Sequence, residues 1–457
     1  MHHIKSLFPQ SLKNIYHLTQ AIVANIWYGF SSRKIKVIGV TGTDGKTTTV
    51  QMITKILEEA GNPVKSGILS DHGARKVAMA STINFSINGE EKKNLSHYTT
   101  ESSFAVQKFI KKAVESGCEY LVLETSSHSL DQHRVWGVQY DTAVITNITR
   151  EHLDYHKTME RYREAKRKLF EIVSRNKGIV IVNLDMENPE YFLKFDADKK
   201  FGYTTNAGLD SGSAVRNDKG EPGMTKETQI IKADDIELGI KNTKFKVNNI
   251  DFTLNLIGKF NIENALAAIC VGLAENISLE EMSKALEKIK RVPGRMEHIE
   301  NDKGLDIIVD FALTPNALKK LYQLLHDIKK PQAKIIAVFG SCGERDRGKR
   351  PIMGEIVSKY ADQIILTNDE PYHEEPTRII EEIAQGIKNK KEGENFWKIP
   401  DRRDAILKAL EMAEEGDIIA ITGMGAEESM VVGDKKIPWN DRKVTEKLLQ
   451  EMKLYQR

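Results

Sequence analysis

From Ile35 onward, short runs of β-branched and apolar residues alternate with longer segments whose apolar residues recur at helical spacing. This alternation is typical of an α/β fold with a mostly parallel, doubly wound sheet. The strands predicted in the first part of the chain are residues 36–40, 120–123, 143–146 and 179–183. Polar turns and short alternating strands between about residues 201 and 255 predict an antiparallel excursion on the same domain.

A second α/β series follows a predicted hinge. Residues 261–289 have helical periodicity, and the segment RVPGR at residues 291–295 has the Pro and Gly expected of a hinge. Further strands are predicted at residues 307–310, 334–339, 363–367 and 417–422. We therefore divide the chain into an N-terminal helical segment (1–34), a central domain (35–292) and a C-terminal Rossmann-like domain (293–457), with a ligand cleft between the two α/β domains.

The N-terminal segment contains an apolar stretch, residues 15–30, which four polar residues interrupt. It is too polar for a membrane span or a cleavable signal. Its apolar positions predict an amphipathic helix with one adhesive face, made of Ile15, Leu18, Ile22, Ile26 and Tyr28. That face either packs on the next domain, which is the commoner arrangement, or contacts a membrane surface or a lipid-linked substrate.

Composition changes this picture little. The 457 residues contain 67 Lys and Arg against 65 Asp and Glu, so no global field recruits nucleic acid, and any phosphate binding must be local. The three cysteines, Cys118, Cys270 and Cys342, are far apart and lack metal-ligand spacing. This usage fits the reducing cytoplasm, where we expect the protein to reside.

The stretch VIGVTGTDGKTTTV, residues 37–50, combines a strand, a Gly-rich loop and the start of a helix. Gly42 and Gly45 let backbone N–H groups approach phosphate oxygens, while Lys46 supplies a positive charge. The predicted nucleotide contacts are Thr43, Asp44, Gly45, Lys46, Thr47 and Thr48. Val40 occupies the first glycine position of the common phosphate-loop pattern, but the strand and helix context favours nucleotide binding.

Mg²⁺ bound with the nucleotide needs oxygen ligands. The Thr47 hydroxyl is one candidate, and Glu124 ends the apolar run YLVLE where a second strand would reach the loop. Taken alone, Glu124 could equally be an ordinary acid at a strand end.

Three further stretches carry a family resemblance. They are ETSSHSLDQHRV (residues 124–135), TNITREHLDYHKTMERYREAK (146–166) and GKFNIENALAA (258–268). With TGTDGKTT, they closely resemble the Mur ligases, and within that family the MurE-type ligases that add the third residue of the peptidoglycan stem to a UDP-N-acetylmuramoyl dipeptide. The resemblance runs from about Ile35 to the C-terminus.

The resemblance implies an ATP-dependent amide ligase in which ATP phosphorylates a carboxylate and an amine attacks the acyl phosphate. It implies two Mg²⁺ sites, one at Thr47 and Glu124 and another at His152. It also implies that Lys166 is carbamylated, although without the family Lys166 would be a solvated helix lysine. The implied catalytic residues are Lys46, Glu124, His152 and Lys166, and the further ATP contacts are Asn264, Arg295 and Asp310.

The two joined substrates are implied in the same way: a muramoyl peptide, or a similar carboxylate, and an amino acid. The positions matching carboxylate contacts are Thr99, Thr100, Ser126, Gln132 and Arg134. Their oxygen-binding groups suit such a ligand, although each hydroxyl taken singly could serve a cap or a turn.

The amino acid is expected to bind at three stretches of the C-terminal domain: GSCGERDRGKRP (residues 340–351), TNDEPYHEEP (367–376) and GMGAEE (423–428). The implied contacts are Arg345, Asp369, Glu370, Tyr372, Gly423 and Glu427. Family members that use diaminopimelate have Asn-Pro-Arg where this chain has Glu370, Pro371 and Tyr372. Because tyrosine lacks the guanidinium fork that grips a distal carboxylate, we favour lysine or another diamino acid without a second carboxylate.

One departure concerns the N-terminus. MurE-type enzymes begin with a uridine-binding domain, whereas this chain has 34 residues before Ile35. Either the sugar-peptide end alone is recognised, or the carboxylate is a different one, for example lipid-linked. Three rivals also remain: a ligase similar to folylpolyglutamate synthase, a catalytically silent nucleotide-binding partner, and a simple P-loop NTPase that would leave the second domain unexplained.

Overall fold

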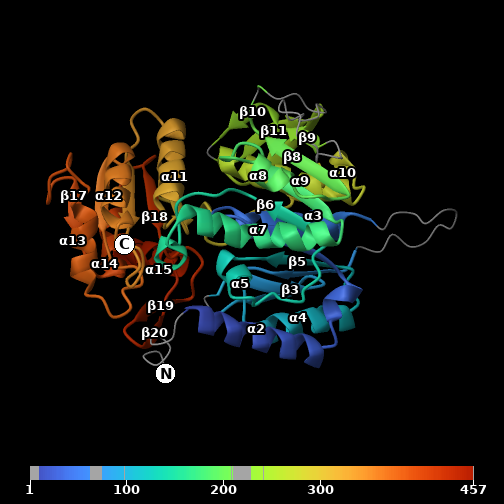
Figure 1. Cartoon of the computed structure of the whole chain (residues 1–457). Helices are drawn as coiled ribbons and strands as arrows, with labels where there is room; N and C mark the ends of the chain where they lie inside the picture. The colour runs from blue at the N-terminus through green and yellow to red at the C-terminus, as the bar shows by residue number, and fades with distance from the viewer. Residues whose placement is uncertain are drawn as a thin grey trace.

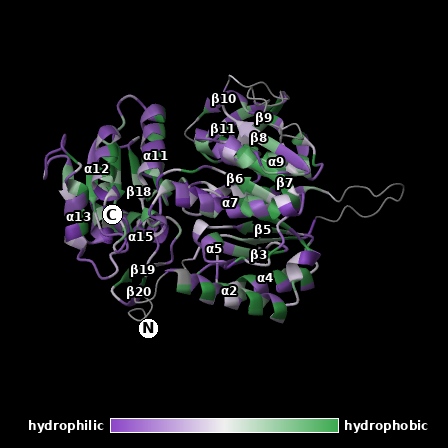
Figure 2. Cartoon of the chain, viewed as in Figure 1, coloured by the Kyte–Doolittle hydropathy of each residue, from purple (hydrophilic) through white to green (hydrophobic). Residues whose placement is uncertain are grey.

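The computed structural model describes residues 10–61, 75–96, 98–206, 208, 228–239 and 241–455. Two α/β units lie side by side, and one long helix runs along the lower face of the first unit (Figure 1). The strands of both units are largely hydrophobic, while the covering helices carry polar residues on their outer sides (Figure 2). The predicted α/β class is confirmed.

The first unit is built on a nine-stranded sheet with the order β4-β3-β2-β5-β1-β6-β7-β8-β9. Its strands are β1 (Lys36–Thr41), β2 (Val77–Ala80), β3 (Asn84–Ile87), β4 (Glu90–Lys93), β5 (Tyr120–Glu124), β6 (Thr142–Ile145), β7 (Ile179–Asn183), β8 (Lys199–Thr204) and β9 (Thr228–Lys232). Only the β2–β3 and β3–β4 pairs, at one edge, are antiparallel, so β3 runs against the other strands. The centre is fully buried, since β1 and β5 have apolar residues on both faces, as parallel strands covered by helices require.

Helices cover both faces of this sheet. They are α3 (Lys46–Glu59), α9 (Lys259–Ala274) and α10 (Leu279–Glu287) on one face, and α4 (Ser103–Glu115), α5 (Ser127–Asp131), α7 (Met159–Arg175) and α8 (Glu190–Leu193) on the other. The short helix α6 (Leu153–His156) precedes α7. The predicted antiparallel excursion is present as β10 (Asp234–Leu238), β11 (Thr243–Val247) and β12 (Ile250–Leu254), but β8 and β9 before it pair in parallel.

The second unit is built on a six-stranded sheet with the order β13-β14-β18-β15-β16-β17, parallel except for β13. Its strands are β13 (Glu297–Ile299), β14 (Asp306–Asp310), β15 (Ile335–Phe339), β16 (Gln363–Leu366), β17 (Phe396–Lys398) and β18 (Ile418–Thr422), with the hairpin β19 (Ser429–Val432) and β20 (Lys435–Pro438) beside them. Its helices are α11 (Pro315–Ile328), α12 (Lys349–Tyr360), α13 (Pro376–Ala384), α14 (Arg402–Met412) and α15 (Asp441–Tyr455).

The predicted hinge connects the two units as a tight turn closed by a bridge between Val292 and Arg295. Gly294 has a φ of 63°, and a Cβ there would lie 2.2 Å from the Ala426 backbone nitrogen, so only glycine fits. The exact domain boundary at 292/293 stays a prediction.

The N-terminal helix is α2 (Gln10–Trp27), followed by the 3₁₀ turn η1 (Ser31–Lys34). One face packs on the first unit through Ala21, Ala24 and Asn25, all fully buried. The predicted adhesive stripe is not wholly buried, because Ile15 and Ile26 are 60% and 63% exposed. None of the helices that the structure describes is long and apolar enough to cross a membrane.

Candidate active site

The phosphate loop joins β1 to α3 at the carboxyl edge of the large sheet. Gly42 has a φ of 149°, and a Cβ there would lie 1.8 Å from Thr146 Oγ1. Gly45 has a φ of 81°, and its Cβ would lie 2.3 Å from Asn264 Oδ1. Both glycines are therefore required by close neighbours as well as by backbone conformation.

Neighbouring segments hold the loop in place. The Asp44 N–H donates to Asn147 Oδ1 at 2.9 Å, and Thr43 Oγ1 lies 3.0 Å from the Tyr162 hydroxyl. Lys46 Nζ donates back to the Thr43 carbonyl at 2.8 Å, so its ammonium lies over the loop where phosphate oxygens would bind.

Glu124 lies at the end of β5, beside the start of α3. Its carboxylate is buried and accepts hydrogen bonds from Thr47 Oγ1 at 3.0 Å and from Thr82 Oγ1 at 2.9 Å, and the Thr82 N–H donates at 2.8 Å. The threonine hydroxyl and the carboxylate thus meet at one point, the donor set that Mg²⁺ prefers.

Lys166, on α7, is not a solvated helix lysine, because its side chain is only 1% exposed. Its Nζ donates to the Gly42 carbonyl at 2.6 Å and lies 4.4 Å from the centre of the Tyr162 ring. Burial, and then the nearby charge of Lys46, lower the pKa of the Lys166 ammonium well below its ordinary value. Burial therefore favours the neutral, nucleophilic amine over the ammonium.

His152 begins α6 in the left-handed backbone region, with a φ of 55°. Its ring centre lies 4.7 Å from that of His128, which lies 5.4 Å from that of His156. Burial, and then the neighbouring His128, lower the pKa of His152 well below its ordinary value. A neutral imidazole is the form that can bind a metal.

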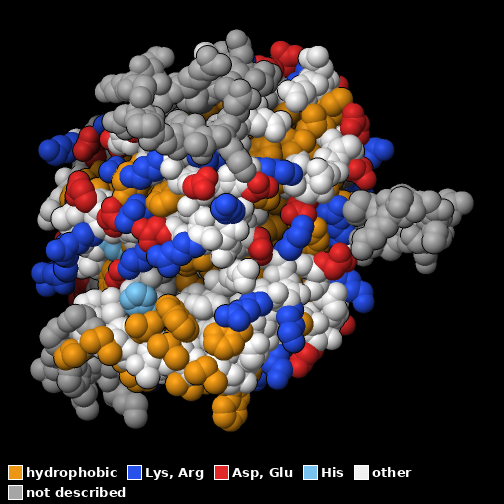
Figure 3. All heavy atoms as spheres, turned by 45° about the vertical axis from the view of Figure 1, so that its right-hand side comes forward, with side chains coloured by type: hydrophobic (Ala, Val, Ile, Leu, Met, Phe, Trp, Pro, Cys, Tyr) orange, Lys and Arg blue, Asp and Glu red, His pale blue; other side chains and the backbone are white. Residues whose placement is uncertain are grey.

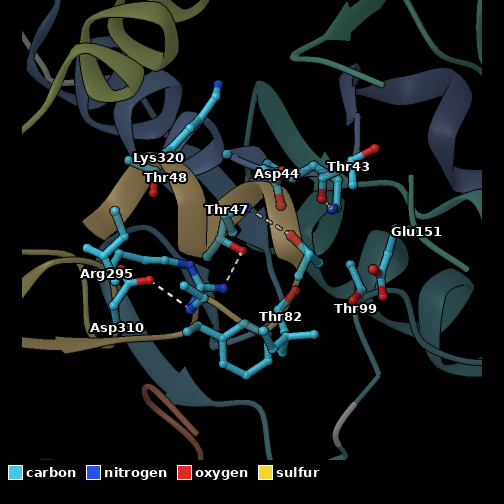
Figure 4. Close-up of a pocket in the computed structure, with 18 of the residues that line it drawn as sticks. Thr43, Asp44, Thr47, Thr48, Thr82, Thr99, Glu151, Arg295, Asp310 and Lys320 are labelled. Carbon is cyan, nitrogen blue, oxygen red and sulfur yellow. Dashed lines mark hydrogen bonds between the residues drawn. The ribbon is translucent and has the colours of Figure 1, made fainter. Parts of the chain in front are cut away.

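Two of the three further ATP positions lie beyond the hinge. Arg295 Nη2 donates to Thr47 Oγ1 at 3.4 Å, and its guanidinium lies 4.6 Å from the centre of the Phe311 ring. Figure 4 shows the Arg295 and Thr47 side chains pointing toward each other. Asp310 accepts from the Met296 and Ala312 N–H groups at 2.7 Å each. The third position, Asn264 on α9, accepts from Thr49 Oγ1 at 3.2 Å, underneath Gly45.

Several of the positions expected to bind the substrate carboxylate form a second cluster around α5. Thr100 Oγ1 donates to the Glu124 carbonyl at 2.9 Å and lies 3.3 Å from Ser126 Oγ. Ser126 also caps α5, because its Oγ accepts from the Ser129 N–H at 3.1 Å. This hydroxyl therefore has the capping role that the sequence offered as an alternative to ligand binding. Arg134 donates to the Thr100 carbonyl, but its Nε is buried with no hydrogen-bond partner among the described residues. Gln132 ends α5, and Thr99 lines the cleft.

The amino-acid positions lie on loops of the second unit. The Arg345 guanidinium lies 5.9 Å from the centre of the Tyr372 ring, and the Tyr372 hydroxyl donates to Glu370 Oε2 at 3.4 Å. Burial, and then Glu370, raise the pKa of the Tyr372 hydroxyl to about 12, so it stays a neutral donor. Asp369 and Gly423 lie close together, since a Cβ at Gly423 would be 2.7 Å from Asp369 Oδ2, and neither residue lines the cleft.

One cavity of about 350 Å³ joins these groups between the two units. The expected residues that line it are Thr43, Asp44, Gly45, Lys46, Thr47, Thr48, Thr99, Glu124, His152, Asn264, Arg295, Asp310, Arg345, Glu370, Tyr372 and Glu427. Lys166, which contacts the phosphate loop at Gly42, does not line the cavity, and neither do Thr100, Ser126, Gln132 and Arg134.

Several residues in and around the cavity were not predicted from the sequence. Thr82, which holds Glu124, follows β2 in a segment with no motif, and Asn147, which holds Asp44, gave no signal of its own within its stretch. Lys349 and Glu151 form a buried ion pair across the cleft at 3.7 Å, and Asn316 donates to Asp44 at 3.3 Å. Only the folded structure places these partners together.

Among the described residues, no group of three or more His, Cys, Asp or Glu side chains is placed to hold a metal. The donors at Thr47 and Glu124 still fit Mg²⁺, which takes few protein ligands and completes its shell with water and substrate phosphates. The residues present thus fit a nucleotide-bound magnesium ion.

A phosphate-loop domain faces a second α/β domain across a cavity lined by carboxylate, guanidinium, ammonium and hydroxyl groups, an arrangement that fits an ATP-dependent ligase. The chain matches the family models for the Mur ligase middle domain at residues 40–272 and for the Mur ligase glutamate ligase domain at residues 294–425. It therefore belongs to the Mur ligase family of ATP-dependent, ADP-forming amide ligases, which act in peptidoglycan precursor synthesis and use Mg²⁺.

Two curated relatives extend the similarity. One is the UDP-N-acetylmuramoyl-L-alanyl-D-glutamate--2,6-diaminopimelate ligase of Clostridium botulinum, 37% identical over 438 residues, covering 94% of this chain and 81% of the relative. The other is the UDP-N-acetylmuramyl-tripeptide synthetase of a Roseiflexus species, 35% identical over 453 residues, covering 94% and 82%.

Solved structures share the fold. A UDP-N-acetylmuramoyl-L-alanyl-D-glutamate--2,6-diaminopimelate ligase superposes with a TM-score of 0.58 at 28% identity, covering 92% of this chain and 79% of that one. The folylpolyglutamate synthase of Mycobacterium tuberculosis superposes with a TM-score of 0.61 at 14% identity, covering 89% and 92%. At that low identity the second likeness shows the fold alone.

Proposed function

We propose that this ligase joins lysine, or another diamino acid without a second carboxylate, to the free carboxylate of a muramoyl dipeptide. The observation that carries the choice of amino acid is the Arg345, Tyr372 and Glu370 cluster in the cleft. The ligase activity itself follows from the family, whereas the residue roles below are part of this proposal.

The first step would transfer the γ-phosphoryl group of ATP to a substrate carboxylate oxygen and release ADP. Lys46 and Arg295 would hold the phosphates from the two sides of the cleft, and Thr47 and Glu124 would hold Mg²⁺. The ion, when bound, supplies charge neutralisation at the phosphates. Arg134, whose Nε lacks a partner among the described residues, would hold the acceptor carboxylate with Thr99, Thr100, Ser126 and Gln132.

Lys166 would carry a carbamate in the active enzyme. Its neutral amine could attack carbon dioxide, forming an N–C bond and releasing one proton. The resulting anion would replace a buried amine whose protonation is unfavourable, and it would stand beside the phosphate loop near His152. We further propose that His152 and this carbamate would together hold a second Mg²⁺.

In the second step the amine attacks the acyl carbon, and the tetrahedral intermediate expels phosphate to leave an amide. Arg345 would pair with the α-carboxylate of the amino acid, while Glu370 and Glu427 supply negative charge for a distal ammonium. Tyr372 offers a single hydroxyl where a distal carboxylate would need a paired donor. The relatives named for diaminopimelate make that amino acid the direct competitor of lysine.

Closure of the cleft protects the acyl phosphate from water. Two contacts that join the two units support this closure. They are the ion pair between Lys349 and Glu151 and the hydrogen bond from Asn316 to Asp44. A lipid-linked carboxylate is the second candidate acceptor, and the exposed apolar residues of α2 are the observation that favours it. The reaction is proposed for the cytoplasm, where the thiols of Cys118, Cys270 and Cys342 stay free.

The test is phosphate release from ATP with muramoyl dipeptides, with and without UDP, crossed with L-lysine, L-ornithine and meso-diaminopimelate. We expect release that depends on both a muramoyl acceptor and lysine or ornithine. Preference for diaminopimelate would overturn the amino-acid assignment, and absence of amino-acid-dependent release with every acceptor would overturn the acceptor assignment.

A further inference from the structure

The outer face of α2 is an unusual surface for a helix of a globular enzyme. Its exposed large apolar residues are Leu12, Ile15, Tyr16, Val23, Ile26 and Trp27, between 46% and 75% exposed. They recur at helical spacing, with Thr19 as the polar position among them, and so form one continuous stripe. Such a contiguous apolar surface on a soluble protein marks an interaction site.

The orientation of α2 is fixed, so this stripe cannot turn inward. Asn25 is fully buried and its Nδ2 donates to the Trp136 carbonyl at 2.6 Å, while Asn14 Nδ2 donates to the Asp131 carbonyl at 3.2 Å. Gly137 lies so close to Asn25 that a Cβ there would be 2.6 Å from the amide. The inner face is therefore held by specific contacts, and the outer face is left to solvent or to a partner.

Helix α4 extends the surface and adds charge to it. It packs beside α2, with the Phe104 ring 6.5 Å from that of Tyr28, and Phe104 is 38% exposed. Lys108, Lys111 and Lys112 of α4 are exposed, and Glu115 lies 3.8 Å from Lys111. Figure 3 shows hydrophobic side chains gathered at the bottom of the molecule with Lys and Arg side chains beside them.

Positive charge prevails on this surface. The described residues 10–34 contain Lys13, Arg33 and Lys34 and no Asp or Glu, although the whole chain is nearly neutral. Arg33 and Lys34 are exposed just beyond the C-terminal end of α2. An apolar stripe containing tryptophan and tyrosine and flanked by cations matches the chemistry of an anionic bilayer surface, with its apolar interior and negative head groups.

We propose that the α2 face, meaning the exposed stripe of α2 with Phe104 and the lysines of α4, docks the enzyme on an anionic lipid bilayer. A second copy of the chain fits this face less well, because a two-fold contact would bring two clusters of cations together with no carboxylate from the described residues 10–34 between them. Docking would hold the acceptor side of the cleft close to the bilayer, since Asn14 contacts Asp131, next to Gln132. This inference does not depend on which amino acid or acceptor the ligase uses.

The experiment is sedimentation of the full chain with vesicles of phosphatidylcholine, alone or mixed with phosphatidylglycerol. We expect binding to the mixed vesicles only, and weaker binding when salt rises from about 0.05 M to about 0.5 M, because screening shortens the range of charge attraction. Release of ADP with soluble substrates, measured in parallel, reports that each protein is folded.

Two variants test the two parts of the surface, each with a matched control. The apolar variant Ile15→Ser, Ile26→Ser and Trp27→Ser should lower the vesicle partition coefficient more than about tenfold. Its control changes three exposed apolar residues elsewhere, Leu238→Ser, Ile437→Ser and Leu454→Ser. The charge variant Lys108→Gln, Lys111→Gln and Lys112→Gln should lower it by about fivefold per lysine. Its control changes Lys244, Lys435 and Lys447 to Gln.

The proposal holds if both face variants lose vesicle binding while their controls bind and all four proteins keep their turnover of soluble substrates. It is overturned if the unchanged protein does not bind the mixed vesicles, or if the face variants bind them as well as the controls do. A concentration-dependent dimer that the apolar variant abolishes, without vesicle binding, would also overturn it and assign the face to a second copy. If a protein loses turnover but still binds the vesicles, the result counts against the proposed ligase reaction and not against membrane docking.

Discussion

Arg295 Nη2 lies 3.4 Å from Thr47 Oγ1, so the first arginine past the hinge turn contacts the hydroxyl at the start of the phosphate-loop helix. The same hydroxyl donates to Glu124, 3.0 Å away, which makes Thr47 the meeting point of the two domains and the candidate metal site. Burial lowers the pKa of Arg295, but the guanidinium keeps its charge, because its ordinary pKa is far above neutrality. Closing the hinge would therefore bring a positive charge to a nucleotide bound at the phosphate loop.

Replacing Arg295 with Lys should lower kcat/KM for ATP by roughly 30- to 100-fold, because an ammonium can neither reach Thr47 in the same way nor stack on Phe311. Steady-state kinetics with varied ATP measure the change. The control is Arg291→Lys in the same hinge segment, where the side chain is 57% exposed. An equal effect at both positions would show that the loss comes from the hinge itself.

Glu124→Gln should weaken Mg²⁺ activation strongly, since an amide cannot replace the negative carboxylate. Thr82→Val removes one hydrogen bond to that carboxylate and should raise the Mg²⁺ concentration for half-maximal rate about 10-fold, in line with other residues that orient metal ligands. Magnesium titration of turnover measures both. Glu91→Gln on exposed β4 is the control, and unchanged Mg²⁺ dependence in Glu124→Gln would contradict the assignment.

Lys166→Ala should abolish most of the turnover, and short carboxylic acids such as acetate or propionate should restore part of it by replacing the carbamate. Removal of carbon dioxide from the buffers should slow the unchanged enzyme and leave the variant unaffected. The control is Lys168→Ala, two residues further along α7, where the partly exposed Lys168 pairs with Asp131. Full turnover of Lys166→Ala would remove the carbamate from the proposal.

The sequence predicted the elements that short-range patterns specify. Strand β1, the glycine loop and α3 follow one another directly along the chain. The phosphate site can therefore be predicted from these contiguous residues alone. The burial of Lys166 could not be predicted from such patterns. Its segment has the periodicity of a surface helix, and the side chain is buried only because it packs against Gly42 and Tyr162. The exposure of Ile15 and Ile26 was also not predictable, since helical spacing alone does not say which apolar stripe meets the core.

Tyr372→Arg should shift the amino-acid preference toward meso-diaminopimelate by at least about 10-fold in the ratio of kcat/KM values, because a guanidinium can hold a second carboxylate at two points. Competition between lysine and diaminopimelate, with the two products separated by mass, measures the ratio. Tyr372→Phe keeps the ring beside Arg345 and should leave the preference nearly unchanged. An unaltered ratio in Tyr372→Arg would show that other residues select the amino acid.

Asp369 gives a prediction for stability. Its side chain is 1% exposed, and burial raises its pKa from 3.8 to about 7, although Arg402 opposes the shift. A carboxyl group with a raised folded-state pKa stabilises the fold fully below its unfolded pKa, and that contribution is lost as the pH rises through the folded pKa. The free energy of unfolding should therefore fall between about pH 4 and pH 7 because of this one group.

Asp369→Asn removes the titration and should change the pH dependence. At about 1.4 kcal/mol per pKa unit, the variant should gain up to about 3 kcal/mol relative to the unchanged protein between pH 5 and pH 8. Urea unfolding followed at both pH values measures the difference. Asp362→Asn, whose partly exposed carboxylate accepts from the Ile335 N–H, is the control for replacing an acid in this unit. A constant difference between the Asp369→Asn variant and the unchanged protein across this pH range would show that Asp369 is already charged at pH 5, and that Arg402 then outweighs its burial.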